Sequence, residues 1–121
     1  MSVIIKLKAG EVRLLSNPET LEYVEKYIER VRNETATSPS LALRVAEYLR
    51  KFSKIPPDRV GELRGKLEEM GLKEESVVMI INICPKTVNE LIGILQVEER
   101  SFEQEFLEKI ISTLKDYCPE E

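Results

Sequence analysis

The side chains that could carry out chemistry are few in this sequence and unsuited to catalysis. The 121 residues include no histidine, the side chain that most often exchanges protons near neutral pH. Carboxylates occur as adjacent pairs, such as Glu68-Glu69 and Glu98-Glu99. Neighbouring residues on a helix point in different directions, so neither pair can act as an acid–base couple. We interpret both pairs as solvated faces and expect no catalytic residue and no enzymatic activity.

The cysteines and glycines give no sign of a cofactor. Cys84 and Cys118, without histidine, cannot complete an ordinary structural zinc site. Cys84 lies in an apolar run and is expected to be a small buried hydrophobic residue, whereas Cys118 is expected to be a free thiol. Gly61 and Gly65 have the wrong spacing for a phosphate-binding loop. The sequence therefore predicts neither a bound metal nor a cofactor.

Charge is distributed unevenly along the chain. Residues 1–60 carry 11 basic and 8 acidic side chains, and residues 61–121 carry 7 basic and 14 acidic ones. The second half, with its net charge of −7, would repel phosphate groups. We therefore do not expect this chain to bind DNA or RNA on its own.

The apolar content excludes a membrane protein. No stretch approaches the roughly 20 apolar residues that a membrane-spanning helix needs, and residues 3–7 are interrupted by Lys6 and lack a cleavage site. We expect a cytoplasmic location. The overall composition, 42% hydrophobic and 33% charged, is typical of a folded helical protein.

The N-terminal segment has the alternation of a β-strand. Val3, Ile5 and Leu7 alternate with other residues up to Gly10, and a second extended piece follows over residues 12–15. Two strands rarely form a stable sheet alone. Either this arm packs irregularly on its own domain or it pairs with a strand of another protein. Apolar β-sequence on a helical protein favours a role in protein interaction.

Two helices are predicted to follow the arm. The first begins at Ser16-Asn17-Pro18-Glu19 and ends near Thr35, with Tyr23 and Tyr27 beside its apolar stripe. The second begins at Ser38-Pro39. Its predicted apolar stripe consists of Ala42, Val45, Ala46, Leu49 and Phe52. Pro56-Pro57 is the best boundary, so we expect a docking part over residues 1–55 and a helical module over residues 56–118.

The module is predicted to be helical and to turn a sharp corner. A helix beginning at Pro57 should end at Gly71, and we interpret the β-branched residues 74–83 as a short buried helix despite their strand propensity. Pro85 stops that element. Thr87 and Glu90 have the spacing of a capping box for the next helix. Ser101 is expected to cap the last helix.

The corner also resembles a known family. The small stalk subunit of archaeal RNA polymerase, the counterpart of the fourth-largest subunit in eukaryotic polymerase II, has a similar segment to Ile83-Cys84-Pro85-Lys86-Thr87-Val88-Asn89-Glu90-Leu91. Asn89 stands where that family commonly has aspartate. The stretch from Arg100 to Leu114 resembles the family's closing helix. The resemblance implies a mainly helical fold with an N-terminal β arm and a C-terminal module similar to the HRDC fold.

The same resemblance implies a partner and a role. The small stalk protein of this family forms a heterodimer with the larger stalk subunit, which links it to the polymerase core and supplies most of the RNA contact. The pair helps to open promoters and to engage initiation factors. The arm would add a strand to that partner, and the first two helices would complete the interface. The implied contact residues are Val3, Ile4, Ile5, Leu7, Val12, Leu14, Tyr23 and Tyr27.

The alternative interpretation is a stand-alone HRDC-like module that binds nucleic acid. Such a module needs a basic face to displace the counterions of the phosphate backbone. The acidic second half of this chain does not offer one.

Overall fold

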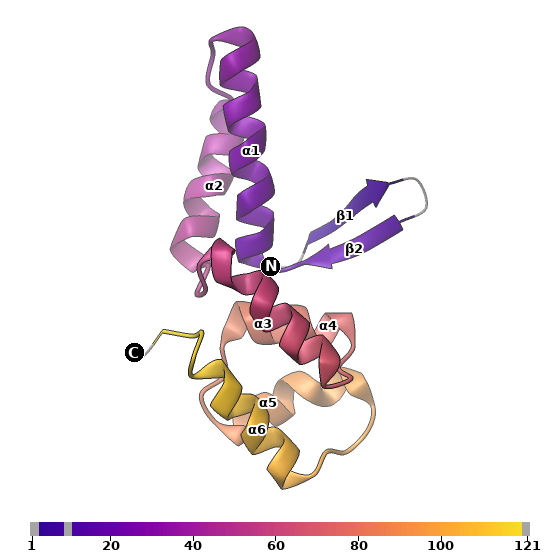
Figure 1. The fold of residues 1–121 in the computed structure, drawn as a ribbon. Coiled ribbons are helices and arrows are strands. Elements are labelled where there is room, and N and C mark those ends of the chain that lie inside the picture. The colour runs from indigo at the N-terminus through magenta and orange to yellow at the C-terminus, as the bar shows by residue number, and fades with distance from the viewer. Residues whose placement is uncertain (1–2, 9–10, 120–121) are drawn as a thin grey trace.

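The structure is a computed structural model that describes residues 3–8 and 11–119. It is mainly helical, as predicted (Figure 1). A short antiparallel β-hairpin, β1 (Val3–Lys8) and β2 (Glu11–Leu15), precedes the helices. The helices are α1 (Asn17–Thr35), α2 (Ser40–Phe52), α3 (Pro57–Glu69), α4 (Glu74–Ile83), α5 (Val88–Ile94) and α6 (Gln104–Leu114), with the 3-10 helix η1 (Leu95–Glu98) after α5.

Helices α1 and α2 form a column on one side of the molecule (Figure 1). Ser16 caps α1, and the Glu19 carboxylate accepts hydrogen bonds from the Ser16 N–H at 2.9 Å and from its hydroxyl at 2.8 Å. The helix ends at Ala36, whose φ of 57° is left-handed. The two helices share a small core of Leu21, Ile28, Ala46 and Leu49. We refer to α1 and α2 as the helical column.

A larger core lies among α3, α4, α5 and α6, which we call the helical module. Helix α4 confirms the helical interpretation of the β-branched segment. Val77, Ile80 and Ile81 are fully buried in it, so packing overrides their strand propensity. Gly71, with φ of 85°, follows the end of α3. The column and the module thus have separate apolar cores.

The corner between α4 and α5 combines a proline with a helix cap. Cys84 ends α4 in the left-handed region, with φ of 52°, directly before Pro85. Thr87 then caps α5, because its Oγ1 accepts a hydrogen bond from the Glu90 N–H at 3.1 Å. The Thr87 hydroxyl also lies 3.2 Å from the Glu90 carboxylate. These contacts end α4 and begin α5 within a few residues.

Two local predictions were wrong. Helix α6 begins at Gln104 after Glu103, not at a Ser101 cap. The chain stays extended through Phe102, whose ring stacks on the Phe106 ring with centroids 5.2 Å apart. Val45 and Phe52 were predicted to lie inward on α2, but they are 38% and 47% exposed. The column is only two helices thick, so it buries just one side of α2.

The cysteines form a disulfide, which corrects the prediction of a free Cys118. Cys84 and Cys118 are bonded, with their Cα atoms 6.0 Å apart. A turn after α6 brings Tyr117 and Cys118 back onto the end of α4, next to Cys84. The side chains of Cys84, Tyr117 and Cys118 are all buried. The 34-residue separation of the cysteines gives no local signal of this pairing. The bond closes the core of the module.

Replacing Thr87 by alanine should lower the free energy of unfolding by about 1 kcal/mol, because the Glu90 N–H loses its acceptor. Urea denaturation followed by circular dichroism measures the change. Ser112→Ala, at an exposed position within α6, is the matched control and should have little effect. Equal losses for the two variants would contradict the capping role.

Reducing the disulfide should lower the free energy of unfolding by about 3–4 kcal/mol, the loop-entropy value for a closed loop of this length. Guanidinium denaturation with and without a reductant measures this loss. The double variant Cys84→Ala/Cys118→Ala should match the reduced protein and ignore the reductant. An unfolding midpoint that is the same for the oxidised and reduced protein would show that the bond does not constrain the module.

Candidate protein-interaction surface

A buried arginine joins the helical column to the helical module. Arg64 of α3 is 1% exposed. Its Nη1 lies 2.7 Å from Glu19 of α1, its Nε 3.3 Å from Glu68 of α3, and its Nη2 forms a 3.3 Å ion pair with Glu74 of α4. A buried charge is tolerated only when it is paired in this way. The guanidinium therefore fixes three helices relative to one another.

The β-hairpin is attached to the same joint. The Leu14 N–H donates to Glu74 Oε1 at 2.7 Å, and the Asn17 N–H donates to Asn82 Oδ1 at 2.7 Å. Arg13 also reaches Glu19, at 3.4 Å. These contacts hold β2 against α4 along its outer edge. In the described part of the chain the sheet has only two strands, so the other side of β1 is a sheet edge.

The predicted contact residues of the arm are placed only in part. The strand register pairs Val3 with Leu15, Ile4 with Leu14, and Ile5 with Arg13. Leu14 is half-buried and Leu15 is buried. The side chains of Val3, Ile4, Ile5, Leu7 and Val12, and the predicted break at Gly10, lie outside what the structure describes.

The helical column exposes an unusual number of large apolar side chains on one side. They are Tyr23 (43% exposed), Tyr27 (45%), Leu41 (73%), Val45 (38%), Tyr48 (44%) and Phe52 (47%). Most stand one residue before a residue packed between the two helices, as Tyr27 does before Ile28 and Tyr48 before Leu49. Because α1 and α2 are antiparallel, the same offset on both helices turns these side chains to the same side. We call this set the aromatic face.

The opposite side of the column is polar. Arg50 of α2 bonds to Glu25 of α1 at 3.0 Å, and Glu29, Arg32 and Asn33 line a hollow there. Basic side chains instead edge the aromatic face. Lys26 lies 5.9 Å from the ring centre of Tyr23, Arg30 lies 5.4 Å from that of Tyr27, and Lys51 lies 5.6 Å from that of Phe52. The column is therefore amphipathic, with lysine and arginine side chains beside the rings on its apolar side, of which Lys26 also pairs with Glu22 at 3.3 Å.

The arm meets one end of the aromatic face at Tyr23. A hollow of about 400 Å³ is lined by Arg13 and Leu15 of β2, by Tyr23 and Lys26 of α1, and by the first turn of α3. Of the predicted residues, Tyr23 lines this hollow and Tyr27 lies one helical turn further along α1, whereas Leu14 does not line it. The exposed side chains of Leu41 and Tyr48 were not among the predicted contacts. The sequence does hold a sign of their position, because Leu41 comes directly before Ala42 and Tyr48 directly before Leu49, which belong to the predicted apolar stripe of α2.

The side chains of this surface are suited to binding another protein and not to catalysing a reaction. It consists of aromatic rings, aliphatic side chains and paired charges, which is the composition of protein–protein interfaces. None of the helices that the structure describes is long and apolar enough to cross a lipid bilayer.

Replacing Arg64 by alanine should lower the free energy of unfolding by about 3–5 kcal/mol, because the buried Glu19 carboxylate loses its closest cation and keeps only the longer contact to the partly exposed Arg13. Arg64→Lys keeps the charge but loses the planar fork, so an intermediate loss is expected. Chemical denaturation measures both losses.

The control for this prediction is Glu68→Gln, which removes the largely exposed partner of the same arginine and should cost less than about 1 kcal/mol. Equal effects of Arg64→Ala and Glu68→Gln would show that Arg64 is not the joint between the column and the module.

Comparison with known proteins identifies the family. The family model of RNA polymerase Rpb4 matches residues 14–118, from β2 to the second cysteine of the disulfide. The chain is also similar to the DNA-directed RNA polymerase subunit Rpo4 of Sulfolobus acidocaldarius, with 29% identity over 94 residues. That alignment covers 77% of this chain and 82% of the relative. The matched region includes the helical column with its aromatic face, the Arg64 joint and the corner at Thr87, and on this evidence the chain belongs to the RNA polymerase Rpb4 family of accessory, non-catalytic polymerase subunits.

Proposed function

We propose that this chain pairs with the larger stalk subunit of archaeal RNA polymerase, is connected to the polymerase core through that partner, and supports transcription initiation in the cytoplasm. The aromatic face is the observation that carries the proposal. Contiguous exposed apolar patches are uncommon on proteins that remain alone, and tyrosine and phenylalanine are enriched where interfaces are buried. A partner would cover this side of the column.

The charges around the aromatic face indicate the complementary surface. Lys26, Arg30 and Lys51 lie beside its rings. The partner should therefore present an apolar centre with acidic side chains around it. Tyr23 and Tyr27 would be central contacts, together with Leu41, Val45, Tyr48 and Phe52.

The β arm would extend the same interface. Glu74 holds the outer edge of β2 at Leu14, so β1 offers the edge to which a partner strand can add. In this proposal Val3, Ile4, Ile5, Leu7, Val12 and Leu14 are the contact residues of the arm. Residues 1–55 then act as the docking part, and residues 56–118 form an HRDC-like module at the outside of the complex.

The module would act through proteins more than through nucleic acid. Residues 61–121 carry 14 acidic and 7 basic side chains, a balance that disfavours contact with phosphate. RNA contact would then come mainly from the larger stalk subunit, and initiation factors would be engaged by the pair. The stand-alone nucleic-acid module has no comparable observation in its favour.

Co-expression with the large stalk subunit tests the proposal. Size-exclusion chromatography with light scattering should show a one-to-one complex for the natural chain. The double variant Tyr48→Glu/Phe52→Glu places two charges in the centre of the interface and should weaken binding at least roughly 100-fold. Asn33→Glu adds the same kind of charge on the polar side of the column and should bind normally.

Hydrogen exchange of the arm separates its role from that of the aromatic face. Amides of β1 should exchange more slowly in the complex than in the free chain, because an added strand would pair with that edge. If the β1 amides exchange at the same rate in the free and the bound chain, strand addition is ruled out and the aromatic face remains as the proposed contact. A chain that ignores the large stalk subunit, or a Tyr48→Glu/Phe52→Glu variant that binds as well as Asn33→Glu, would overturn the proposed interface.

A further inference from the structure

The disulfide attaches a short turn that follows the last helix. The amides of residues 116–118 each donate to a carbonyl at the end of α6, at 3.2, 3.0 and 2.8 Å. These bonds form a turn that is not part of the helix. We call residues 115–119 the Cys118 turn. Because the turn lies outside α6, it can move away from the module without unwinding that helix.

Two polar contacts hold the Cys118 turn on the surface of the module. Arg59 of α3 donates from Nη1 to the Asp116 carbonyl at 2.8 Å, and the Lys86 ammonium donates to the Pro119 carbonyl. Both contacts are exposed. Water competes for such groups, so exposed hydrogen bonds add little to stability. These two contacts alone would hold the turn only weakly.

The Tyr117 side chain packs the turn against α3. Its ring is 5% exposed, with Arg59 at 4.5 Å and Lys66 at 5.0 Å from the ring centre. A hydrogen bond from the Tyr117 hydroxyl is the main reason why the pKa of Glu62 lies below its usual range. Fixing the backbone of a short turn costs free energy of the same order as the burial of one tyrosine returns. Without the covalent bond, the turn is therefore near balance between an attached and a released state.

Cys118 is the accessible half of the disulfide. It is 8% exposed, whereas Cys84 is 3% exposed. A small hollow of about 40 Å³ opens beside Cys118 and does not include Cys84. The hollow is lined by Pro85, Lys86, Ile111, Leu114, Lys115 and Cys118. A thiol can thus approach the bond from the side of Cys118 while the module stays folded.

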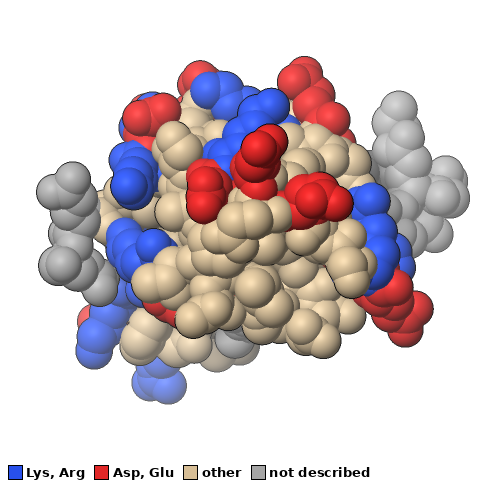
Figure 2. Space-filling model, turned by 90° about the horizontal axis from the view of Figure 1, so that it is seen from below, with Lys and Arg blue, Asp and Glu red and all other residues tan. Residues whose placement is uncertain are grey.

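The charged side chains that line the hollow are both lysines. Lys86 and Lys115 belong to the lining, and the carboxylate of Asp116 does not. This positive charge is local, because residues 61–121 carry 14 acidic and 7 basic side chains. Figure 2 views the molecule from below and shows lysine and arginine at the margins of a broad uncharged area, with acidic side chains among them. Nearby cations favour the thiolate, which is both the attacking and the leaving group in disulfide exchange.

We propose that the bond between Cys84 and Cys118 is a redox-sensitive latch, which a dithiol reductant opens in the folded chain and which then releases the Cys118 turn from α3. A thiolate of the reductant attacks the Cys118 sulfur, the S–S bond breaks, and Cys84 leaves as a thiolate. The second thiol of the reductant, as its thiolate, displaces Cys118 from the mixed disulfide. The reductant becomes a disulfide, and its two protons end on the two cysteines.

The latch fits the setting in which a polymerase subunit works. Lasting disulfides are uncommon inside cells, where thiols are kept reduced, and many of those that form are transient. The inference therefore rests on membership of the RNA polymerase Rpb4 family and not on the proposed pairing with the larger stalk subunit. The alternative is a permanent staple, which would stay closed until the module unfolds.

The rate of reduction separates a latch from a staple. The full chain is treated with dithiothreitol, and alkylation of the new thiols followed by mass spectrometry measures the rate. Urea below the unfolding transition should change this rate less than about twofold, because the reductant attacks the folded chain. A rate that climbs steeply with urea would show that the bond opens only after unfolding, and it would overturn the inference.

The lysines of the hollow provide a matched pair of variants. Lys115→Gln removes a positive charge beside the bond and should slow reduction roughly threefold. Lys109→Gln removes an exposed lysine of α6 that does not line the hollow, and it should reduce at the normal rate. Equal rates for the two variants would show that the hollow is not the route of attack and would contradict the inference.

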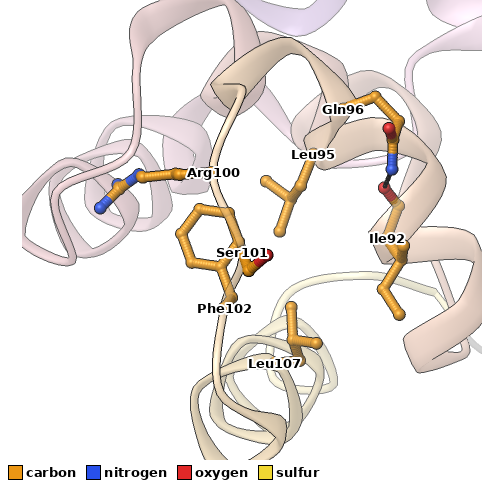
Figure 3. Close-up of a pocket in the computed structure, with 7 residues that line it drawn as sticks. All are labelled: Ile92, Leu95, Gln96, Arg100, Ser101, Phe102 and Leu107. Carbon is orange, nitrogen blue, oxygen red and sulfur yellow. Dashed lines mark hydrogen bonds between the residues drawn. The ribbon is translucent and has the colours of Figure 1, made fainter.

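NMR of the oxidised and reduced chain tests the release of the turn. The amide signals of residues 116–118 should move toward the positions of an unstructured chain after reduction. Signals of the column and of the opening at the other end of α6, where Leu95 and Leu107 lie (Figure 3), should stay in place. The double variant Cys84→Ala/Cys118→Ala should give the reduced pattern with or without reductant.

Two results of the NMR experiment would overturn the latch. If the signals of the turn do not move, the bond holds nothing that reduction can release. If signals throughout the module collapse together, the bond is a staple of the whole fold. Neither result bears on the pairing with the large stalk subunit, because that protein is absent from these experiments.

Discussion

Arg64 is a full positive charge with almost no access to water, and the arrangement of the two parts of the chain depends on how that charge is paired. Its carboxylate partners come from α1, α3 and α4. Moving the helical column away from the module would leave charges buried without partners, which costs several kcal/mol. The interaction therefore holds two small apolar cores together, with help from the hydrogen bond between Asn17 and Asn82.

The fixed arrangement separates two surfaces of opposite character. The aromatic face carries exposed tyrosines with lysine and arginine beside their rings, whereas residues 61–121, which form the module, carry 14 acidic and 7 basic side chains. The charge is therefore uneven in space as well as in sequence, because the first half of the chain forms the column and the second half forms the module.

Sequence reasoning succeeded where the determinants are local. The caps at Ser16 and Thr87 and the glycine after α3 are read from neighbouring residues, and the helical form of α4 follows from its flanking helices. It failed where the determinants are distant. Cys84 and Cys118 meet only after the module has folded, and Arg64 looks like any surface arginine until Glu19 is placed beside it. Periodicity also does not tell which of two apolar stripes on α2 is buried: Leu41, Val45, Tyr48 and Phe52 have helical spacing too, but in the described chain they stay exposed.

The contact between Leu14 and Glu74 has a further consequence for stoichiometry. An isolated β-hairpin has two open edges, and each can accept a strand, which is how sheets grow without limit. Here a side chain from α4 occupies the outer edge of β2 and uses its second oxygen for Arg64. Growth by strand addition is thereby confined to one direction. A charged residue in the body of the protein thus acts as a stop for the sheet and favours one acceptor strand per chain over open-ended association.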